Sequence, residues 1–299
     1  MEPIIVLVGF LGAGKTTVLK HLIKKLLKES WDPFVILNDY ENAAVDSQQF
    51  LSFLEPNQIQ ALSGSCICCS GINELRLQVN SIPKRKKGIT LIEANGTTDA
   101  MALMEFLGVG LNKNFLPPVQ ISVVDCRKWQ QRNYYNDIEL SQVLVSSLVF
   151  LNHLEDLSVK DLDKVKKSIS ELNRSALFKS WCDFELSDLI NLSPAKKHTY
   201  RLDHKRTHWA SSSASLPDPL SSNALQKIIA SLPNEILRVK GCTKLDKDTH
   251  YTHFEKTPKD LDLKIRPYWG KLVSGPVILT VGPGSDPIVL KKVVSKSIL

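Results

Sequence analysis

The stretch that most constrains the fold of this chain is Gly9 to Thr16, which reads GFLGAGKT. It follows an apolar, β-branched run from Ile4 to Val8, and it precedes a segment whose apolar residues recur at helical spacing. Two glycines five positions apart, followed by a lysine and a hydroxyl residue, form the pattern Gly-x-x-x-x-Gly-Lys-[Ser/Thr]. Between a strand and a helix, this pattern predicts a loop that wraps the phosphates of a nucleoside triphosphate.

The residue types of this loop match the chemistry of phosphate binding. Glycines let backbone N–H groups approach phosphate oxygens, and the following helix points its positive N-terminal end at the same anion. We expect Lys15 to neutralise the outer phosphates and Thr16 to ligate the Mg²⁺ that bridges them. The residues predicted to contact the nucleotide here are Gly9, Gly12, Ala13, Gly14, Lys15, Thr16 and Thr17.

Two further apolar runs end in acidic residues, as strands that carry ligand sites in a parallel sheet often do. Residues 34–37 lead into a candidate switch segment, in which we expect Asp39 or Glu41 near the Mg²⁺; a solvated acidic loop is the alternative. Residues 89–92 lead into Glu93, which is expected to hold the Mg²⁺ or its water shell unless it is only a structural turn residue. Gly96 would let a backbone N–H approach the γ-phosphate.

Three cysteines within four residues, Cys66, Cys68 and Cys69, form the second informative feature. On a regular strand Cys69 would oppose the other two, so the three thiolates converge only in a loop, which the flanking Gly64 and Gly71 permit. Three thiolates suit Zn²⁺ or Cu(I), with Co²⁺ also feasible, and they leave a fourth position open. A redox pair or inert buried thiols are the alternatives.

Two more strands are expected at residues 119–124 and 147–151, with helical patterns between them. The first half of the chain therefore predicts an α/β fold with a doubly wound, mostly parallel sheet. The segment after the last strand, Asn152 to Asp156, lies where such folds recognise the base of a nucleotide. Asn152 can brace the phosphate loop, and Glu155 can accept hydrogen bonds from guanine.

Composition limits the remaining classes. With 299 residues, of which 43% are apolar and 23% charged, the chain can build one large domain or two. The net charge of +7 includes a basic run, Lys84 to Lys87, without interleaved aromatics, which predicts a solvated loop and argues against nucleic-acid binding. No apolar stretch has the length of a membrane span or the form of a secretory leader, so we expect a cytoplasmic protein with reduced cysteines.

The second part of the chain has a different character. We expect a nucleotide- and metal-binding domain at 1–192, a linker at 193–212 and a small α+β domain at 213–299. The linker is predicted to run up to the serine stretch Ser211–Ser213. In the last domain, helices are predicted at 225–232 and 287–294, and strands at 236–239, 251–254 and 276–281. The linker carries His198, His204 and His208, for which a solvated cluster is favoured over an auxiliary metal site.

These motifs together resemble the CobW-type metallochaperone GTPases, relatives of the HypB and UreG nickel-insertion GTPases, over nearly the whole chain. Residues 9–17 match the phosphate loop of that family almost letter for letter, and residues 66–69 match its Cys-x-Cys-Cys signature. Residues 93–96, Glu-Ala-Asn-Gly, resemble its Glu-Thr-Thr-Gly Mg²⁺ motif. Further similarities are Gln142, Asn152 and the segment 236–241.

Two segments depart from the family pattern. Residues 38–42 read Asn-Asp-Tyr-Glu-Asn where the family has Asn-Glu-Phe-Gly-Glu, so an acid remains at Asp39 and the glycine is lost. Residues 152–155 read Asn-His-Leu-Glu in place of Asn-Lys-x-Asp, which leaves Glu155 or the next residue, Asp156, to pair with guanine.

The resemblance implies a GTPase that uses Mg²⁺, holds Zn²⁺ or Co²⁺ at the cysteine loop and delivers it to a client metalloprotein. Lys15, Thr16 and Glu93 would serve hydrolysis, which is expected to be slow because no strong general base stands out. A nucleotide- or metal-sensing module without hydrolysis is the main alternative, and a small-molecule kinase is disfavoured because no Arg-rich lid is apparent. The metal, the client, the choice between GTP and ATP, and a homodimeric state are left open.

Overall fold

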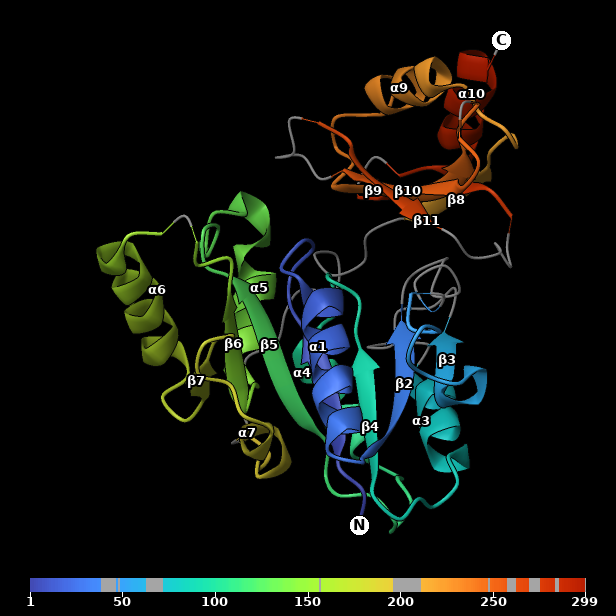
Figure 1. Cartoon of the computed structure of the whole chain (residues 1–299). Coiled ribbons are helices and arrows are strands. Elements are labelled where there is room, and N and C mark those ends of the chain that lie inside the picture. Colours follow the sequence, from blue (N-terminus) through green and yellow to red (C-terminus); the bar gives the residue numbers. More distant parts are fainter. Residues whose placement is uncertain are drawn as a thin grey trace. The chain divides into compact units, whose positions relative to one another are not determined.

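The computed structural model describes residues 1–38, 47, 49–62, 72–155, 157–195, 211–246, 248–256, 262–268, 275–282 and 285–298. These residues fall into two compact units (Figure 1). The first unit contains the elements from β1 to α7, and the second contains those from β8 to α10. Each unit has its own sheet and its own core.

The first unit is built on a seven-stranded sheet in the order β3-β2-β4-β1-β5-β6-β7, in which every pairing is parallel. The strands are β1 (Ile4–Val8), β2 (Asp32–Asn38), β3 (Ile59–Leu62), β4 (Gly88–Glu93), β5 (Val119–Asp125), β6 (Leu148–Asn152) and β7 (Leu177–Lys179). All five residues of β1 are buried, as expected of a strand covered on both faces. The predicted doubly wound α/β fold is confirmed.

Helices cover both faces of this sheet, with α1 on one face and α3 and α4 on the other (Figure 1). They are α1 (Lys15–Lys28), α3 (Ile72–Ser81), α4 (Ala100–Leu107), α5 (Asn136–Leu144), α6 (Val159–Leu172) and α7 (Leu186–Ile190), with short 3₁₀ turns η1 (Pro56–Gln58) and η2 (Asn133–Tyr135). The even residues of β1 pack against α3 and α4 in one cluster. Because strand side chains alternate, the odd residues Ile5 and Leu7 face α1.

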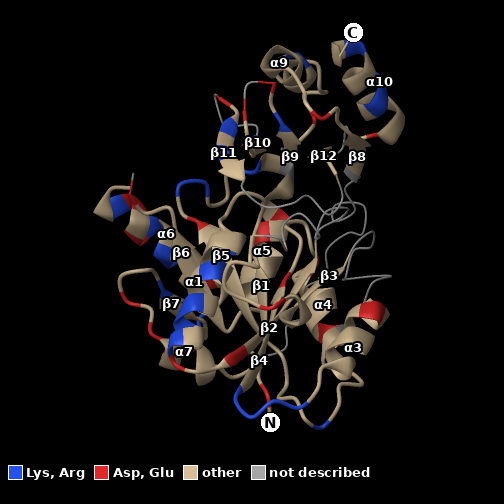
Figure 2. Cartoon of the chain, turned by 45° about the vertical axis from the view of Figure 1, so that its right-hand side comes forward, with Lys and Arg blue, Asp and Glu red and all other residues tan. Residues whose placement is uncertain are grey.

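Helix α1 shows how local sequence produces the element that follows the phosphate loop. Its apolar residues at helical spacing, among them Leu19, Leu22 and Ile23, are fully buried, and each contributes roughly 1.5–3 kcal/mol when removed from water. Its lysines lie on the other face, and Lys25 and Lys28 occupy the last turn, where they complement the negative end of the helix dipole. Figure 2 shows that basic residues are distributed over several helices, including α1, α6 and α10.

The second unit is an antiparallel five-stranded sheet in the order β11-β10-β9-β12-β8, packed against two helices. Its elements are β8 (Ser211–Ser215), α9 (Ser222–Ala230), β9 (Arg238–Lys244), β10 (Tyr251–Lys256), β11 (Lys264–Tyr268), β12 (Val277–Val281) and α10 (Pro287–Ile298). Phe254 and Ile278 from the sheet meet Leu225 and Ile228 of α9 and Leu290 of α10 in one core. The predicted α+β architecture is confirmed.

The predicted extent of the linker was wrong at its C-terminal end. Ser211–Ser213 belong to β8, which pairs with β12, and Ser212 is fully buried. A Ser-rich segment suggests a loop because serine competes for backbone hydrogen bonds, but pairing with a buried apolar strand outweighs that preference. Residues 196–210, with His198, His204 and His208, lie outside the described residues.

The predicted strand at 236–239 also had the wrong bounds, since β9 runs from Arg238 to Lys244. Its centre is Gly241, a residue that reads as a strand breaker. The glycine is there because the Phe254 ring of the next strand lies against it and leaves no room for a Cβ. Strands β3, β7 and β11 were not predicted, because they are short or lack an apolar run. No helix in the described part of the chain is long and apolar enough to cross a membrane.

Candidate functional site

The candidate site lies at the carboxyl edge of the parallel sheet, where the loops after β1, β2, β4 and β5 begin. In the register of the sheet, Glu93 at the end of β4 pairs with Leu7 of β1 on one side and with Leu37 of β2 on the other. The phosphate loop, the segment after Asn38 and the turn after Glu93 therefore start side by side. Open parallel sheets bind ligands at this edge.

The phosphate loop has the backbone conformations that its glycines were expected to supply. Gly12 has φ 79° and Gly14 has φ 96°, both in the left-handed region that side chains disfavour. Gly9 has φ 149°, and a Cβ at this position would overlap the carbonyl oxygen of Val123 in β5. The loop is thus held against the neighbouring strand at its start and turned by glycines at its end.

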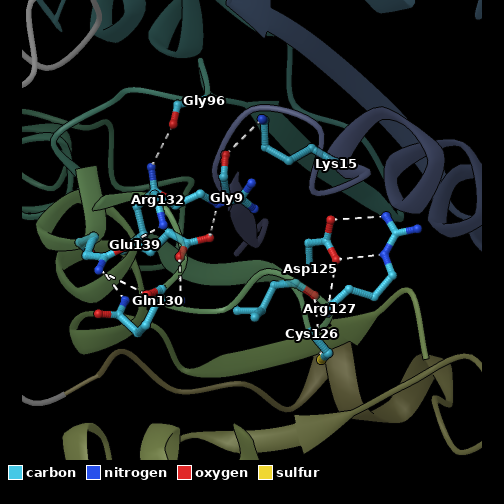
Figure 3. A network of polar contacts seen from close by, with 12 residues as sticks. Gly9, Lys15, Gly96, Asp125, Cys126, Arg127, Gln130, Arg132 and Glu139 are labelled. Atoms are coloured by element: carbon cyan, nitrogen blue, oxygen red, sulfur yellow. Dashed lines mark hydrogen bonds and ion pairs between the residues drawn. The ribbon is translucent and has the colours of Figure 1, made fainter. Parts of the chain in front are cut away.

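Lys15 lies inside this loop. The residue is only 5% exposed. Its Nζ donates to the carbonyl oxygen of Gly9 at 2.9 Å (Figure 3). A buried ammonium needs acceptors because it has lost its water shell. The contact to Gly9 holds the charge within the curve of the loop, where the phosphates of a nucleotide would bind.

Thr16 and Glu93 meet although 77 residues separate them in the chain. The Thr16 hydroxyl donates to Glu93 Oε1 at 2.8 Å. Neighbouring ligands of an octahedral Mg²⁺, each about 2.0–2.1 Å from the ion, lie about 2.9 Å apart, so these two oxygens have the spacing and the hard-donor chemistry that Mg²⁺ requires. The predicted pair of Mg²⁺ residues is brought together by the adjacency of β1 and β4.

The turn after Glu93 abuts the phosphate loop at Gly96. A Cβ added to Gly96 would lie 2.8 Å from both the backbone nitrogen and Cγ of Leu11, closer than real Cβ contacts allow. From behind, Gln142 Nε2 donates to the carbonyl oxygens of Gly96 at 3.2 Å and Thr98 at 3.3 Å. From the sequence, Gln142 is singled out only by family resemblance; in the structure it supports the turn after Glu93.

Asn152, the last residue of β6, braces the phosphate loop; β6 is separated from β1 by β5 alone. Its side-chain Nδ2 donates to the carbonyl oxygen of Ala13 at 2.9 Å, and the residue is only 7% exposed. His153 follows in a left-handed conformation, φ 57°, with a buried Nε2 that has no hydrogen-bond partner among the described residues. Glu155 is exposed, and Asp156 lies outside the described residues.

A cluster beside the loop, on residues that follow β5, was missed by sequence reasoning. Arg127 pairs with buried Asp125, and Arg132 pairs with buried Glu139, both at 3.1 Å or less (Figure 3). Gln130 N–H also donates to Glu139 Oε2 at 3.1 Å. Burial raises the pKa of the Glu139 carboxyl, while the charge and hydrogen bond of Arg132 act in the opposite direction. Arg127 and Arg132 lie in a polar segment, in which charged residues are usually solvated, so the sequence carries no signal that they are paired.

The predicted metal ligands Cys66, Cys68 and Cys69, and the predicted switch residues Asp39 and Glu41, lie outside the described residues. The described part of the chain contains no group of three or more His, Cys, Asp or Glu residues that could hold a metal ion. The cysteine segment nevertheless begins after Leu62 at the end of β3, which pairs with Asn38 of β2. With about 4.8 Å between strands, β3 lies roughly 14 Å from β1 along the same sheet edge.

The three remaining cysteines, Cys126, Cys182 and Cys242, belong to no group of potential metal ligands among the described residues. Cys126 is buried, and burial, with the nearby Asp125 carboxylate, raises the pKa of its thiol to about 12. Burial also raises the pKa of the Cys242 thiol to about 12. Both are therefore protonated at neutral pH, and a metal binds the thiolate. Cys182 is exposed.

The parallel sheet, the glycine conformations and the pairing of Thr16 with Glu93 define a phosphate-loop nucleotide-binding protein. Comparison with family models gives a narrower placement. The model of the CobW/HypB/UreG nucleotide-binding domain matches residues 3–179, which is more than half of the chain. The chain belongs to the CobW/HypB/UreG family.

Two relatives are about a quarter identical to this chain over the aligned residues. The zinc chaperone YjiA of Escherichia coli is 25% identical over 280 residues, which cover 85% of this chain and 86% of YjiA. The zinc-regulated GTPase metalloprotein activator 1 of Dictyostelium discoideum is 24% identical over 212 residues, 58% of this chain. The match spans less than half, 44%, of that relative's length.

Solved structures similar to this chain include zinc-bound YjiA GTPase from E. coli, with a TM-score of 0.40 and 16% identity over 99% of both chains. Another is HypB from Helicobacter pylori in complex with nickel, with a TM-score of 0.42 and 14% identity over 67% of this chain and 92% of HypB.

Proposed function

We propose that this protein is a GTP-hydrolysing metallochaperone: it binds a transition metal at Cys66, Cys68 and Cys69 and delivers it to a client metalloprotein under nucleotide control. The observation that carries the nucleotide half is the contact of Thr16 with Glu93, which supports a Mg²⁺ site at the mouth of the phosphate loop. Family membership supports the metal half, together with the Cys-x-Cys-Cys motif itself.

In this proposal the described residues have distinct tasks. Backbone N–H groups of the loop that begins at Gly9 bind phosphate oxygens, and Lys15 neutralises them. Thr16 and Glu93 would hold Mg²⁺, which supplies charge neutralisation at the β- and γ-phosphates. Asn152 keeps the loop in its binding shape through Ala13. Asp39, at the end of β2, would belong to the segment that orders around the triphosphate.

Sheet order supports coupling between the two sites. The cysteine segment follows β3, the Asp39 segment follows β2, and Glu93 ends β4, and these three strands are consecutive neighbours. A γ-phosphate that orders the segments after β2 and β4 would therefore act next to the metal site. A coupling free energy of about 1–3 kcal/mol, roughly 5–150-fold in affinity, suffices to alternate capture and release.

Zinc is favoured over cobalt by the names of the relatives, a zinc chaperone and a zinc-regulated GTPase metalloprotein activator. The second name also favours a protein client that is activated by its metal. Three cysteine thiolates with an open fourth position suit Zn²⁺, and an open position suits an ion that is handed on.

The test is to measure Zn²⁺ and Co²⁺ affinity with a non-hydrolysable GTP analogue, with GDP and without nucleotide. The variant Cys66→Ser/Cys68→Ser should lose metal affinity at least tenfold, whereas Cys182→Ser, a change at an exposed cysteine, should not. Equal affinity of the wild type in all three nucleotide states would refute nucleotide control.

A sensor that binds nucleotide without hydrolysing it is the second candidate, and the base side of the site favours it. His153 replaces the lysine of the guanine motif and Glu155 is exposed, so this side departs from the family pattern. Single-turnover hydrolysis of GTP and ATP, with Lys15→Ala as the inactive control, separates the two candidates. Tight binding without phosphate release would support the sensor.

A further inference from the structure

Arg132 is a buried cation beside the phosphate loop. It precedes η2, and its side chain is 9% exposed. Nε donates to Glu139 Oε1 at 3.0 Å, and the guanidinium carbon lies 4.7 Å from the centre of the Phe10 ring. Phe10 is the second residue of the phosphate loop, so Arg132 stacks directly on that loop.

The hydrogen bonds of Arg132 are incomplete. Its Nη2 atom is buried and has no hydrogen-bond partner among the described residues. A guanidinium carries five N–H donors, and a buried donor without an acceptor is destabilising, so an arginine that served only to pack on Phe10 would be a poor choice there. The unfilled donor is a reason to look for a ligand that supplies the acceptor.

The surrounding loop holds Arg132 in place. Its backbone N–H donates to Asn136 Oδ1 at 2.7 Å, and Asn136 Nδ2 donates to the carbonyl oxygen of Gln130 at 3.0 Å. Glu139 is held in turn by the Gln130 N–H at 3.1 Å. The guanidinium therefore has a fixed plane and a fixed partner on one side, which also fixes the direction of the donors on Nη2.

Its place in the sheet identifies the acceptor. Arg132 follows β5, and β5 is the neighbour of β1, so the loop that carries it begins at the same carboxyl edge as the phosphate loop. The stacking on Phe10 puts the Arg132 side chain at the start of the phosphate loop, next to Gly9 in the chain (Figure 3). Anionic ligands at such an edge are bound by donors from adjacent loops, and a guanidinium is well suited to phosphate oxygens.

We propose that Arg132 is a second cationic residue of the nucleotide site, whose Nη2 donates to an oxygen of the outer phosphate of the bound triphosphate while Nε stays paired with Glu139. The proposal rests on the proposed function of the same site. It adds to Lys15 a rigid, planar donor that the Phe10 ring orients. Because an outer phosphate adds charge and oxygens, we expect Arg132 to favour triphosphate over diphosphate.

The experiment measures dissociation constants of full-length wild type, Arg132→Gln and Arg132→Lys for a non-hydrolysable GTP analogue and for GDP with Mg²⁺. Arg132→Gln should lower the affinity for the analogue about tenfold or more and the affinity for GDP much less, since one charge-assisted hydrogen bond to the outer phosphate is lost. Arg132→Lys keeps the charge and should recover part of the loss. Arg127→Gln is the matched control, because Arg127 lies in the same loop and pairs with Asp125.

The outcomes separate this inference from the wider proposal. If the analogue and GDP weaken equally in Arg132→Gln, or neither weakens, Arg132 does not bind the outer phosphate and the inference is overturned. Thermal unfolding without nucleotide identifies a variant that merely fails to fold. If Arg132→Gln is such a variant, the affinities of Arg132→Lys for the analogue and for GDP decide whether Arg132 binds the outer phosphate. If wild type does not bind triphosphate, or Lys15→Ala binds as well as wild type, the nucleotide function itself has failed.

Discussion

The two sides of the nucleotide site differ in how completely the fold specifies them. On the phosphate side, Lys15 is held by Gly9 of its own loop, whereas Thr16, Glu93 and Gly96 are positioned by contacts between the ends of neighbouring strands. On the base side, after β6, Asn152 is anchored, His153 has an unfilled Nε2 and Glu155 is exposed. From this difference we predict that the phosphates of a nucleotide are bound strongly and that the choice among bases is weak.

The largest effect is expected for Lys15→Ala. The ammonium is buried in the loop and donates to Gly9, so its removal leaves the outer phosphates without their main counter-charge. Triphosphate affinity should fall at least a hundredfold in calorimetric titration. Lys164→Ala, which changes an exposed lysine of α6, is the control and should bind as wild type does. Comparable binding by both variants would contradict the importance of the phosphate side.

Gly96→Ala should be the next most damaging change. The new methyl group would meet the Leu11 backbone at 2.8 Å, so the turn and the phosphate loop must separate. We expect a loss of about 1–3 kcal/mol in the free energy of unfolding and at least a tenfold slower single-turnover hydrolysis. Gly108→Ala is the matched control, because its nearest neighbours would lie at 3.8 and 3.9 Å, an ordinary contact. Equal effects of the two changes would show that the close approach is unimportant.

Asn152→Ala tests the brace that connects the two sides. Its removal leaves the Ala13 carbonyl without that donor, which should cost about 1–2 kcal/mol of stability by denaturant unfolding. Nucleotide affinity should fall for GTP and ATP alike, because the phosphate loop and not the base is affected. A loss confined to GTP would instead place Asn152 at the base.

His153→Lys should have the smallest effect on nucleotide affinity and the clearest effect on the choice between GTP and ATP. It restores the residue type of the guanine motif at the position where the structure has an unfilled imidazole nitrogen. We expect the ratio of GTP to ATP affinity to rise a few-fold, with phosphate contacts unchanged. Competition binding measures the ratio, and a strong guanine preference already present in the wild type would contradict weak discrimination.

Thiol reactivity provides a further check of the base side. Cys126 N–H donates to the carbonyl oxygen of Asn152, and burial raises the pKa of its thiol to about 12, so at pH 8 it should be almost entirely protonated. In a background with Cys66, Cys68 and Cys69 changed to serine, exposed Cys182 should be alkylated quickly and Cys126 only after unfolding. Mass spectrometry of time points identifies the labelled cysteine. Rapid labelling of Cys126 would show that this side opens readily.

Sequence reasoning succeeded where local pattern and burial agree. Continuous apolar runs predicted β1, β2, β4, β5 and β6, because parallel strands are covered on both faces. It failed where one face is polar or a side chain is missing for a packing reason, as in Ser-rich β8 and in β9 around Gly241. There the strand exists because a neighbour pairs with it.

The sequence by itself determined the phosphate loop, since glycine positions and the Lys-Thr pair have few other uses between a strand and a helix. Only the tertiary structure decided which distant residues join it. Strand order brings Glu93 to Thr16, Asn152 to Ala13 and Arg132 to Phe10. The physical reason is that a motif is local in the chain, whereas a site at the edge of a parallel sheet is assembled from loops whose proximity depends on strand pairing.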